Sequence, residues 1–461
     1  MSSSPSNPIA LRVGPSPSLW RLSAIALAAS WAVFVLLLYV SSFRAEAWGL
    51  LGVVLLASTT YFAWHWPFAT VLALVAVLPF QPLPTMIAQA VDVPHIHMIS
   101  GVKEGLFLIA IVSGLSHRRI KLQTVDYILV ALILMTIVSR LFGGYWMGIK
   151  DDWEFALPFF AGRLFPIPSK YELRWVKIVL ASMSIVAVLG ILEYLFVPLE
   201  LRILWLGLTK APEYYSAAGY SGERIGSTLA GPTEFGNCCA LAFIFYWAYK
   251  SHLRRWWMAG AACIGIGLFL SVTRGAWLAA ALGVALLEVR TGRSVRLVVG
   301  VLAGACLFLA LLPVLGLKGY YKETTSLQDP SLQGHLATAR ASVDAALDHP
   351  LGTGPGTAGP RAVERDPNAI GIEGSFLTIS VEYGIFAGVL FVLFCLLCLK
   401  GCLDNPSRLG LAAASVLLGY LSMLAITPAH QSLATAALAL FPAGAALNKK
   451  VRTSKPLPVK R

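Results

Sequence analysis

The side chains best suited to chemistry in this sequence are arginines that stand at the ends of apolar segments. Arg274 lies in the short link 271–275 between two such segments, and Arg224 precedes the segment that starts near Thr233. A guanidinium group presents five N–H donors in a planar fork, which matches a pair of phosphate oxygens. Pro232 is typical of a first helical turn, and free N–H groups at that helix start would also attract an anion. Together these residues predict a diphosphate site.

Arg163 is the third candidate for that site, inside the apolar stretch 155–168. A charge immersed in lipid is costly unless it has a partner or faces a water-filled cavity, so we assign Arg163 to diphosphate binding as well. If the stretch lies only at the interface, the side chain reaches water by itself and needs no function. Structural roles stay open for the other two, Arg274 as a helix cap and Arg224 within its loop.

A transfer reaction at a diphosphate needs a base that takes the proton of an acceptor hydroxyl. Glu373 is our first choice because it stands at the membrane end of the longest loop, where burial against lipid would raise the pKa of its carboxyl towards neutrality. His430, in the link 428–431, is the second choice. Both are assigned as catalytic. No metal and no cofactor are predicted, since His95 and His97 have ligand-like spacing but no third ligand.

The elements that must position these residues are membrane-spanning helices. Apolar residues make up 57% and charged residues 13% of the 461 residues, and the mean hydropathy is +0.72, far above that of a soluble domain. Backbone immersed in lipid must be helical. We therefore predict an all-α polytopic membrane protein, a single integral membrane domain over residues 1–461 with about 12 to 14 transmembrane helices. The expected spans are 23–42, 48–62, 68–83, 99–115, 125–142, 155–168, 175–197, 235–249, 258–272, 276–287, 297–317, 376–399, 409–426 and 433–447.

Charge predicts the orientation of this bundle. Basic residues concentrate in alternate loops, and by the positive-inside rule these loops and both termini are cytoplasmic. The basic loops carry Arg118, Arg119 and Lys121; Lys250, Arg254 and Arg255; Arg290, Arg293 and Arg296; and Lys400 and Arg408. The opposite side receives 197–234, 271–275, 318–375 and 428–431, which hold Arg224, Arg274, Glu373 and His430. The net charge of +13 does not predict nucleic-acid binding, because the basic residues are scattered among loops.

The loop 318–375 is the one large extramembrane element that we expect. Its middle part, 334–347, has the periodicity of a helix. The apolar face of that helix carries Leu336, Ala339, Val343 and Leu347. His349-Pro350 would end the helix, and the glycine-rich turn 352–356 follows. A loop of this length in an otherwise economical chain is usually functional.

Several of these motifs, taken in order, resemble the O-antigen ligase and polymerase superfamily. They are Arg224-Ile-Gly-Ser, Thr273-Arg274-Gly-Ala-Trp, the loop helix, Asp348-His-Pro-Leu-Gly-Thr-Gly-Pro-Gly, and Glu373-Gly-Ser-Phe-Leu with Glu382-Tyr-Gly-Ile. Members of that family transfer a glycan from an undecaprenyl diphosphate carrier to a hydroxyl, outside the bacterial cytoplasmic membrane and without a metal. The resemblance implies that Arg224 and Arg274 bind the diphosphate. Ligases commonly carry a histidine followed by asparagine where Glu373 stands, so a polymerase is slightly preferred.

The resemblance implies an inverting, metal-independent glycosyltransferase of O-antigen or exopolysaccharide synthesis. Its partners would be a lipid-linked oligosaccharide donor, a glycan acceptor, membrane lipid and proteins of polysaccharide assembly, with no nucleic acid. No phosphate-binding loop for ATP is present in the sequence. A transporter or flippase of a lipid-linked or anionic solute is the alternative, and it would use the same arginines only for binding. The candidates stand at the outer ends of segments rather than at mid-membrane depth, which favours transfer over transport.

Overall fold

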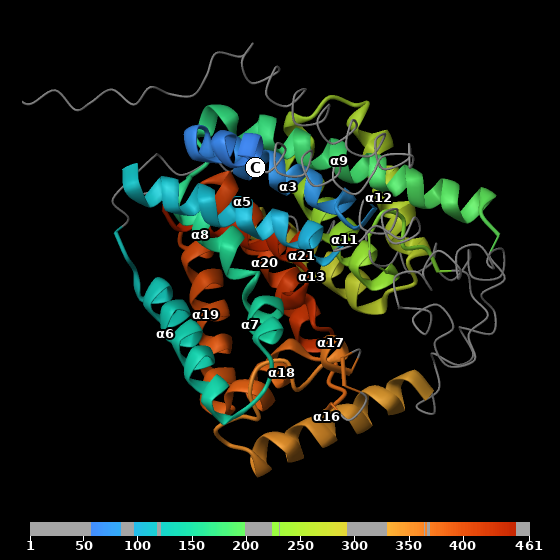
Figure 1. The fold of residues 1–461 in the computed structure, drawn as a ribbon. Coiled ribbons are helices and arrows are strands. Elements are labelled where there is room, and N and C mark those ends of the chain that lie inside the picture. The colour runs from blue at the N-terminus through green and yellow to red at the C-terminus, as the bar shows by residue number, and fades with distance from the viewer. Residues whose placement is uncertain are drawn as a thin grey trace, which may run out of the picture.

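The computed structural model describes residues 57–83, 96–117, 121–198, 224–229, 231–292, 330–363, 365–366 and 369–448. Within these ranges every regular element is a helix (Figure 1), apart from an isolated bridge between Ala358 and Ile370. The all-α prediction is therefore confirmed. The predicted spans 23–42 and 297–317, most of 48–62, and the basic tail after 448 lie outside the described residues.

Within the described ranges, the bundle has nine longer helices and several short ones. The longer ones are α5 (Ile96–His117), α6 (Thr124–Ser139), α9 (Ser169–Phe196), α11 (Pro232–Tyr249), α12 (Trp257–Leu270), α13 (Arg274–Arg290), α19 (Ile385–Leu403), α20 (Arg408–Ile426) and α21 (Leu433–Leu447). The shorter α-helices are α3 (Pro67–Val77), α7 (Trp146–Trp153), α8 (Ala156–Leu164), α17 (Pro360–Val363) and α18 (Ser375–Tyr383), and the loop helix is α16 (Pro330–Asp348). Single 3-10 turns are η1 (Leu78–Phe80), η2 (Arg140–Phe142), η5 (Lys250–His252) and η6 (Ala429–Gln431).

The lengths and composition of these helices fit a polytopic membrane protein. Among the described residues, α9, α19 and α20 are each long and apolar enough to cross a membrane. The helices Ala57–His65 and Pro67–Phe80 pass the same test together and are bent by 120° at their break. The helices α6, α12 and α21 are apolar but shorter, as expected of spans that pair or break within about 30 Å of hydrocarbon.

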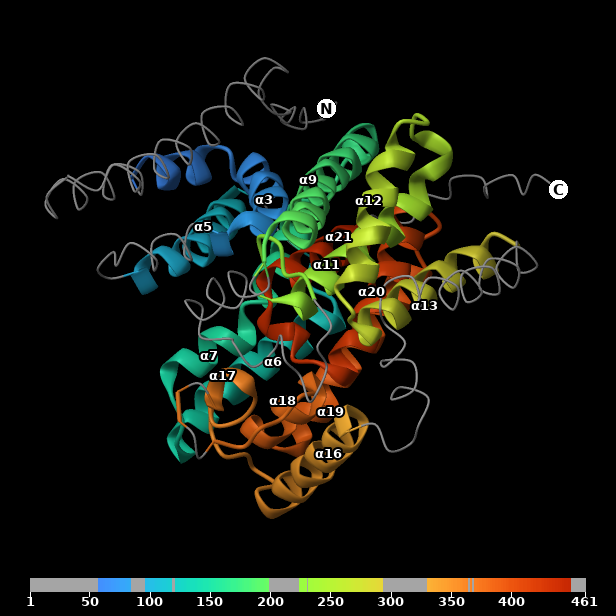
Figure 2. The same ribbon diagram turned by 90° about the vertical axis from the view of Figure 1, so that its right-hand side faces the viewer.

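Helix α21 forms the centre of the bundle. Almost all of its side chains are buried, and it packs on α8, α11, α19 and α20, as the two views in Figures 1 and 2 show. The contact with α8 is made by glycines: a Cβ atom on Gly162 would lie 2.2 Å from the carbonyl oxygen of Phe441, and one on Gly444 would lie 2.4 Å from that of Phe159. Small residues allow membrane helices this close approach.

The stretch 155–168 is not one spanning helix. Helix α8 has nine residues, about 14 Å of rise, which is too short for the hydrocarbon core. Helix α7 comes directly before it, and the joint between the two carries Glu154. The sequence left open whether this stretch crosses the membrane, and α8 is shorter than the apolar run because it ends at Leu164, just before Pro166 and Pro168.

The predicted span 376–399 is also interrupted. Helix α18 ends at Tyr383. The next residue, Gly384, has a φ of +92°, which glycine adopts readily and other residues adopt only with strain. A Cβ atom there would lie 2.6 Å from the carbonyl oxygen of Pro350. The glycine-rich turn after α16 therefore packs directly against the break between α18 and α19, and it attaches the loop to the bundle.

Candidate functional site

Arg224 is held against the turn that precedes Arg274. Its Nε donates to the carbonyl oxygen of Ser271 at 3.0 Å, and its Nη2 donates to Thr273 Oγ1 at 3.1 Å. The Thr273 hydroxyl in turn donates to the carbonyl oxygen of Pro232 at 3.2 Å, at the start of α11. Arg274 is the first residue of α13, and its side chain is exposed. The structure thus brings together the two arginine motifs and the helix start that the sequence singled out.

Close packing fixes the shape of this corner. Val272 has a φ of +50°, which is unusual for a β-branched residue and is held by the surrounding turn. A Cβ atom on Gly236 would lie 2.5 Å from Ser271 Oγ, so α11 presses directly on the turn. On the other side, the backbone N–H of Ser227 donates to Glu193 Oε2 at 2.7 Å and anchors the Arg224 segment to α9.

The last turn of α20 connects Arg274 with Glu373. A Cβ atom on Gly275 would lie 3.7 Å from Ile426 Cδ1, and one on Gly374 would lie 3.0 Å from the carbonyl oxygen of Ala425. The residues next to these glycines, Arg274 and Glu373, therefore border the same helix end. The Glu373 side chain is exposed, as is that of Arg274.

His430 lies next to this corner but is fully buried. Its Nδ1 is 2.8 Å from Ser375 Oγ, and its Nε2 is 3.2 Å from Asp152 Oδ1. Ser375 also donates to the carbonyl oxygen of Thr427 at 2.9 Å. With both ring nitrogens engaged and no exposed surface, the imidazole holds the start of α18, two residues after Glu373. This geometry fits a positioning residue better than a base that touches substrate.

Asp152 is the centre of a buried polar network that the sequence analysis missed. Its Oδ2 accepts a hydrogen bond from the Tyr383 hydroxyl at 2.5 Å, and its Oδ1 accepts one from Gln431 Nε2 at 2.6 Å. Glu382, next to Tyr383, accepts the backbone N–H of Ala358 at 2.8 Å. Helices α7 and α18, the turn η6 and the loop after α16 therefore meet around two fully buried carboxyl groups, those of Asp152 and Glu382. Acidic residues next to apolar stretches were the available signal.

A group of ion pairs covers this network on the loop side. Arg361 Nη1 is 2.9 Å from Asp151 Oδ1, and Arg365 Nη2 is 3.0 Å from Asp151 Oδ2. Arg361 also donates to the carbonyl oxygen of Gln431 and lies 3.6 Å from Glu154 Oε1. Burial by itself would lower the pKa of Arg361, but the carboxylates of Glu154 and Asp151 outweigh it and raise that pKa above its ordinary value. The short helix α17, which carries Arg361, is thus tied to α7 and η6.

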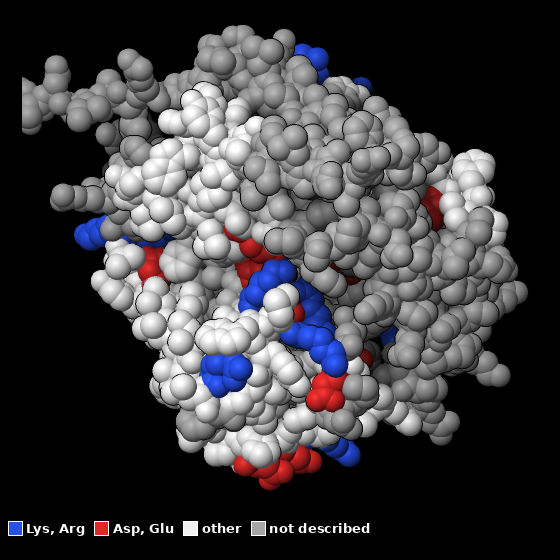
Figure 3. Space-filling model, viewed as in Figure 1, with Lys and Arg blue, Asp and Glu red and all other residues white. Residues whose placement is uncertain are grey.

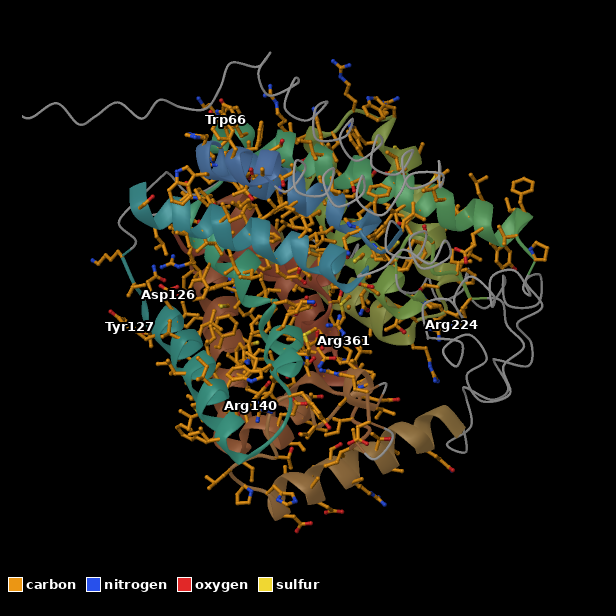
Figure 4. All side chains as sticks on the ribbon, viewed as in Figure 1. Trp66, Asp126, Tyr127, Arg140, Arg224 and Arg361 are labelled. Carbon is orange, nitrogen blue, oxygen red and sulfur yellow. The ribbon has the colours of Figure 1, made fainter. Side chains whose placement is uncertain are left out.

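Further lysine side chains lie near these ion pairs, on the side that faces solvent. Lys150 and Lys103 lie 3.3 Å and 3.7 Å from Glu104 Oε1. Figure 3 shows Lys and Arg side chains, with acidic ones beside them, gathered in the middle of the face over α7 and α17. Figure 4 labels Arg361, near α17, and Arg224 to its right in this view. Glu234, in the first turn of α11, accepts a hydrogen bond from Ser432 and helps to raise the pKa of Arg361.

Arg163 is not part of this arrangement. Its Nε and Nη2 lie 2.9 Å and 2.8 Å from the two carboxylate oxygens of Asp126, and only 1% of its side chain is exposed. Its carbonyl oxygen accepts a hydrogen bond from Asn448, at the C-terminal end of α21. Turn η6 is at the other end of that 15-residue helix, about 22 Å away. Because the Asp126 carboxylate already binds two nitrogens of the Arg163 guanidinium, we leave Arg163 out of the site.

Removing one partner of this buried pair should destabilise the protein. Arg163→Leu leaves Asp126 as an uncompensated buried charge, which costs about 3 to 5 kcal/mol. We expect a clearly lower unfolding temperature in detergent, and partial recovery in the double variant Arg163→Leu/Asp126→Leu. Loss of ligand binding at an unchanged unfolding temperature would instead return Arg163 to the diphosphate site.

Comparison with known proteins adds one match. Residues 259–392 match the family model described as O-antigen ligase. The matched segment runs from α12 into α19 and contains Arg274, Arg361 and Glu373, whereas Arg224 and Asp152 lie before it. No curated protein matches the sequence. Among the residues that the structure describes, no three His, Cys, Asp or Glu side chains converge as metal ligands.

Proposed function

We propose that this membrane protein, which carries the O-antigen ligase domain of the ligase and polymerase superfamily at residues 259–392, transfers a glycan from an undecaprenyl diphosphate carrier to a sugar hydroxyl. The observation that carries the proposal is the placement of the two arginine motifs: Arg224 is hydrogen-bonded to the turn before Arg274, and the glycines next to Arg274 and Glu373 both pack on the last turn of α20. The reaction would take place on the outer side of the bacterial cytoplasmic membrane, with both termini in the cytoplasm and 318–375 as an extracytoplasmic loop.

The two arginines would bind the diphosphate of the donor. Arg224 is oriented by Ser271 and Thr273 before any ligand arrives, so little side-chain freedom is lost on binding. Arg274 adds an exposed guanidinium at the helix start directly after that turn. As the bond between the anomeric carbon and the diphosphate oxygen breaks, the electron pair passes to the diphosphate. Guanidinium groups stabilise this growing charge more in the transition state than in the bound donor.

Glu373 would complete the transfer as the base. The acceptor hydroxyl oxygen forms the new bond to the anomeric carbon from the face opposite the diphosphate, which inverts the configuration. Its proton passes to the Glu373 carboxylate. A metal ion takes no part in this scheme. Asp152, His430 and Ser375 position the segment that carries Glu373 and do not contact the sugar.

We infer a polymerase slightly ahead of a ligase. The family's ligases commonly carry histidine followed by asparagine where this chain has Glu373 and Gly374. A polymerase of O-antigen or exopolysaccharide would take a second lipid-linked glycan as acceptor, whereas a ligase would take a lipid A core. The proteins of polysaccharide assembly that deliver these substrates would be its partners in the membrane.

Incubation of the purified protein with a synthetic undecaprenyl-diphosphate oligosaccharide tests this proposal. A lengthened lipid-linked glycan is the expected product. Transfer to an added lipid A core would make the protein a ligase and keep the proposed chemistry. The opposite result is no transfer to either acceptor, together with movement of the intact donor between the two leaflets of vesicles that contain the protein. That result would contradict the proposed transferase and support a flippase.

A further inference from the structure

Helix α16 exposes a row of large apolar side chains outside the bundle. Leu336, Val343 and Leu347 lie within about 40° of one another around the helix axis, and 54%, 46% and 64% of their surfaces are exposed. The side that packs on α18 is a different one, with the buried residues Ser342 and Ala346. The predicted apolar face exists, but it does not attach the helix to the protein. Figures 1 and 2 both show α16 at the edge of the molecule, beside α18.

The apolar row continues into the lipid-facing side of a membrane span. Leu351, in the turn after α16, is 69% exposed. This turn meets the start of α19, where the backbone N–H of Ile385 donates to the carbonyl oxygen of Pro350 at 3.2 Å. Phe386, the next residue of α19, is also exposed, and α19 is long and apolar enough to cross a membrane. The row is therefore an extension of the surface that faces the acyl chains.

Aromatic side chains beside the glycine-rich turn that follows α16 indicate how deep this turn lies in the membrane. Tyr145 and Trp146 are exposed, and the Arg140 guanidinium lies 5.4 Å from the centre of the Trp146 ring. The backbone N–H of Tyr145 donates to the carbonyl oxygen of Pro355, in the glycine-rich turn that follows α16, at 2.7 Å. Tyrosine and tryptophan gather where a membrane meets water. The glycine-rich turn, and with it the end of α16, then lies at the interface.

We propose that α16 is an interfacial helix, with a phospholipid surface covering its apolar row. Leu336, Val343, Leu347 and Leu351 enter the boundary between headgroups and acyl chains. Asp344 and Asp348 are exposed and remain in water. Arg340 is also exposed and lies on the same side of the helix as the row, where its long side chain carries the guanidinium group out to the headgroups. With one arginine and two aspartates α16 has no net positive charge, so apolar burial rather than attraction to anionic lipid provides its affinity. The contact is independent of glycan transfer, but it would hold the loop and Glu373 at the height of a lipid-linked diphosphate.

Spin labels on the full-length protein in nanodiscs of phosphatidylethanolamine and phosphatidylglycerol test this contact. Labels are attached to Val343→Cys and Leu347→Cys, with Asp344→Cys as the matched position and the unsubstituted protein as background for its native cysteines. Frequent collision of a label with oxygen shows that the label is in lipid, and frequent collision with a nickel chelate shows that it is in water. We expect oxygen to dominate at 343 and 347 and the nickel chelate to dominate at 344.

Two outcomes would overturn the proposal. Nickel-dominated collision at all three positions would mean that the row faces water. Exclusion of both probes at 343 and 347, with spin–spin broadening that disappears on dilution with unlabelled protein, would mean that a second copy of the chain covers the row.

Discussion

Replacing Arg274 by alanine is expected to abolish glycan transfer while the protein still inserts and accumulates normally. The side chain is exposed at the start of α13, so its loss leaves no buried charge without a partner. What is lost is a donor to the departing diphosphate. Removing one such group from a preorganised site slows the chemical step about 10²- to 10³-fold. The initial rate on a synthetic lipid-diphosphate oligosaccharide measures this effect.

Two further variants are the controls for that experiment. One removes an arginine outside the site, and the other keeps the charge at position 274 but changes the shape of the charged group. Arg290→Ala removes an exposed arginine at the other end of the same helix and should stay within about twofold of the unmodified rate. Arg274→Lys should be intermediate, because an ammonium keeps the charge but has no planar fork. Unchanged glycan product from Arg274→Ala would remove this arginine from the diphosphate site.

Glu373→Gln is expected to cost at least as much activity. Glutamine has the shape of glutamate, but its amide does not accept the acceptor's proton, and losing a general base slows transfer about 10²- to 10⁴-fold. Glu373→His should keep some activity, because a neutral imidazole accepts a proton. In that variant the rate should fall as the pH drops below about 6.5, where a histidine becomes protonated.

Full activity of Glu373→Gln would move the base to another group, and His430 would then be tested. Because the imidazole is buried between Ser375 and Asp152, we expect His430→Gln to lower the unfolding temperature together with the rate. A lower rate at an unchanged unfolding temperature, with an altered pH profile, would identify His430 as the base.

Local patterns in the sequence predicted the parts of this fold that depend on near neighbours. Pro232 correctly marked the start of α11, and residues 271–275 correctly marked the turn between α12 and α13. The periodicity over 334–347 found most of α16. In each case a proline, a glycine or a regular spacing determines the backbone within a few residues.

The interruptions of apolar segments were not predicted. An apolar run continues on both sides of Gly384, so hydropathy alone reads one helix where the structure has α18 and α19. The break depends on contact with Pro350, more than 30 residues earlier in the sequence. The acids at 151–154 were overlooked for a similar reason: their partners, Arg361 and His430, are far away along the chain.

Pairing between distant charges decided the two largest changes to the candidate site. Arg163 was assigned to a ligand because a charge inside an apolar stretch needs a partner, yet Asp126 neutralises it from another helix. His430 was read as an accessible base, yet Asp152 and Ser375 occupy both of its ring nitrogens. A single sequence does not record such contacts, whereas the exposed positions of Arg274 and Glu373 follow from the ends of their segments.

A structure of the protein with undecaprenyl diphosphate bound, in a nanodisc, tests the central claim most directly. We expect the diphosphate oxygens within hydrogen-bond distance of both Arg224 and Arg274, with the Glu373 carboxylate facing the position of the anomeric carbon. A diphosphate bound elsewhere, for example at Arg361 and Arg365, with both of these arginines pointing away from it, would contradict the account.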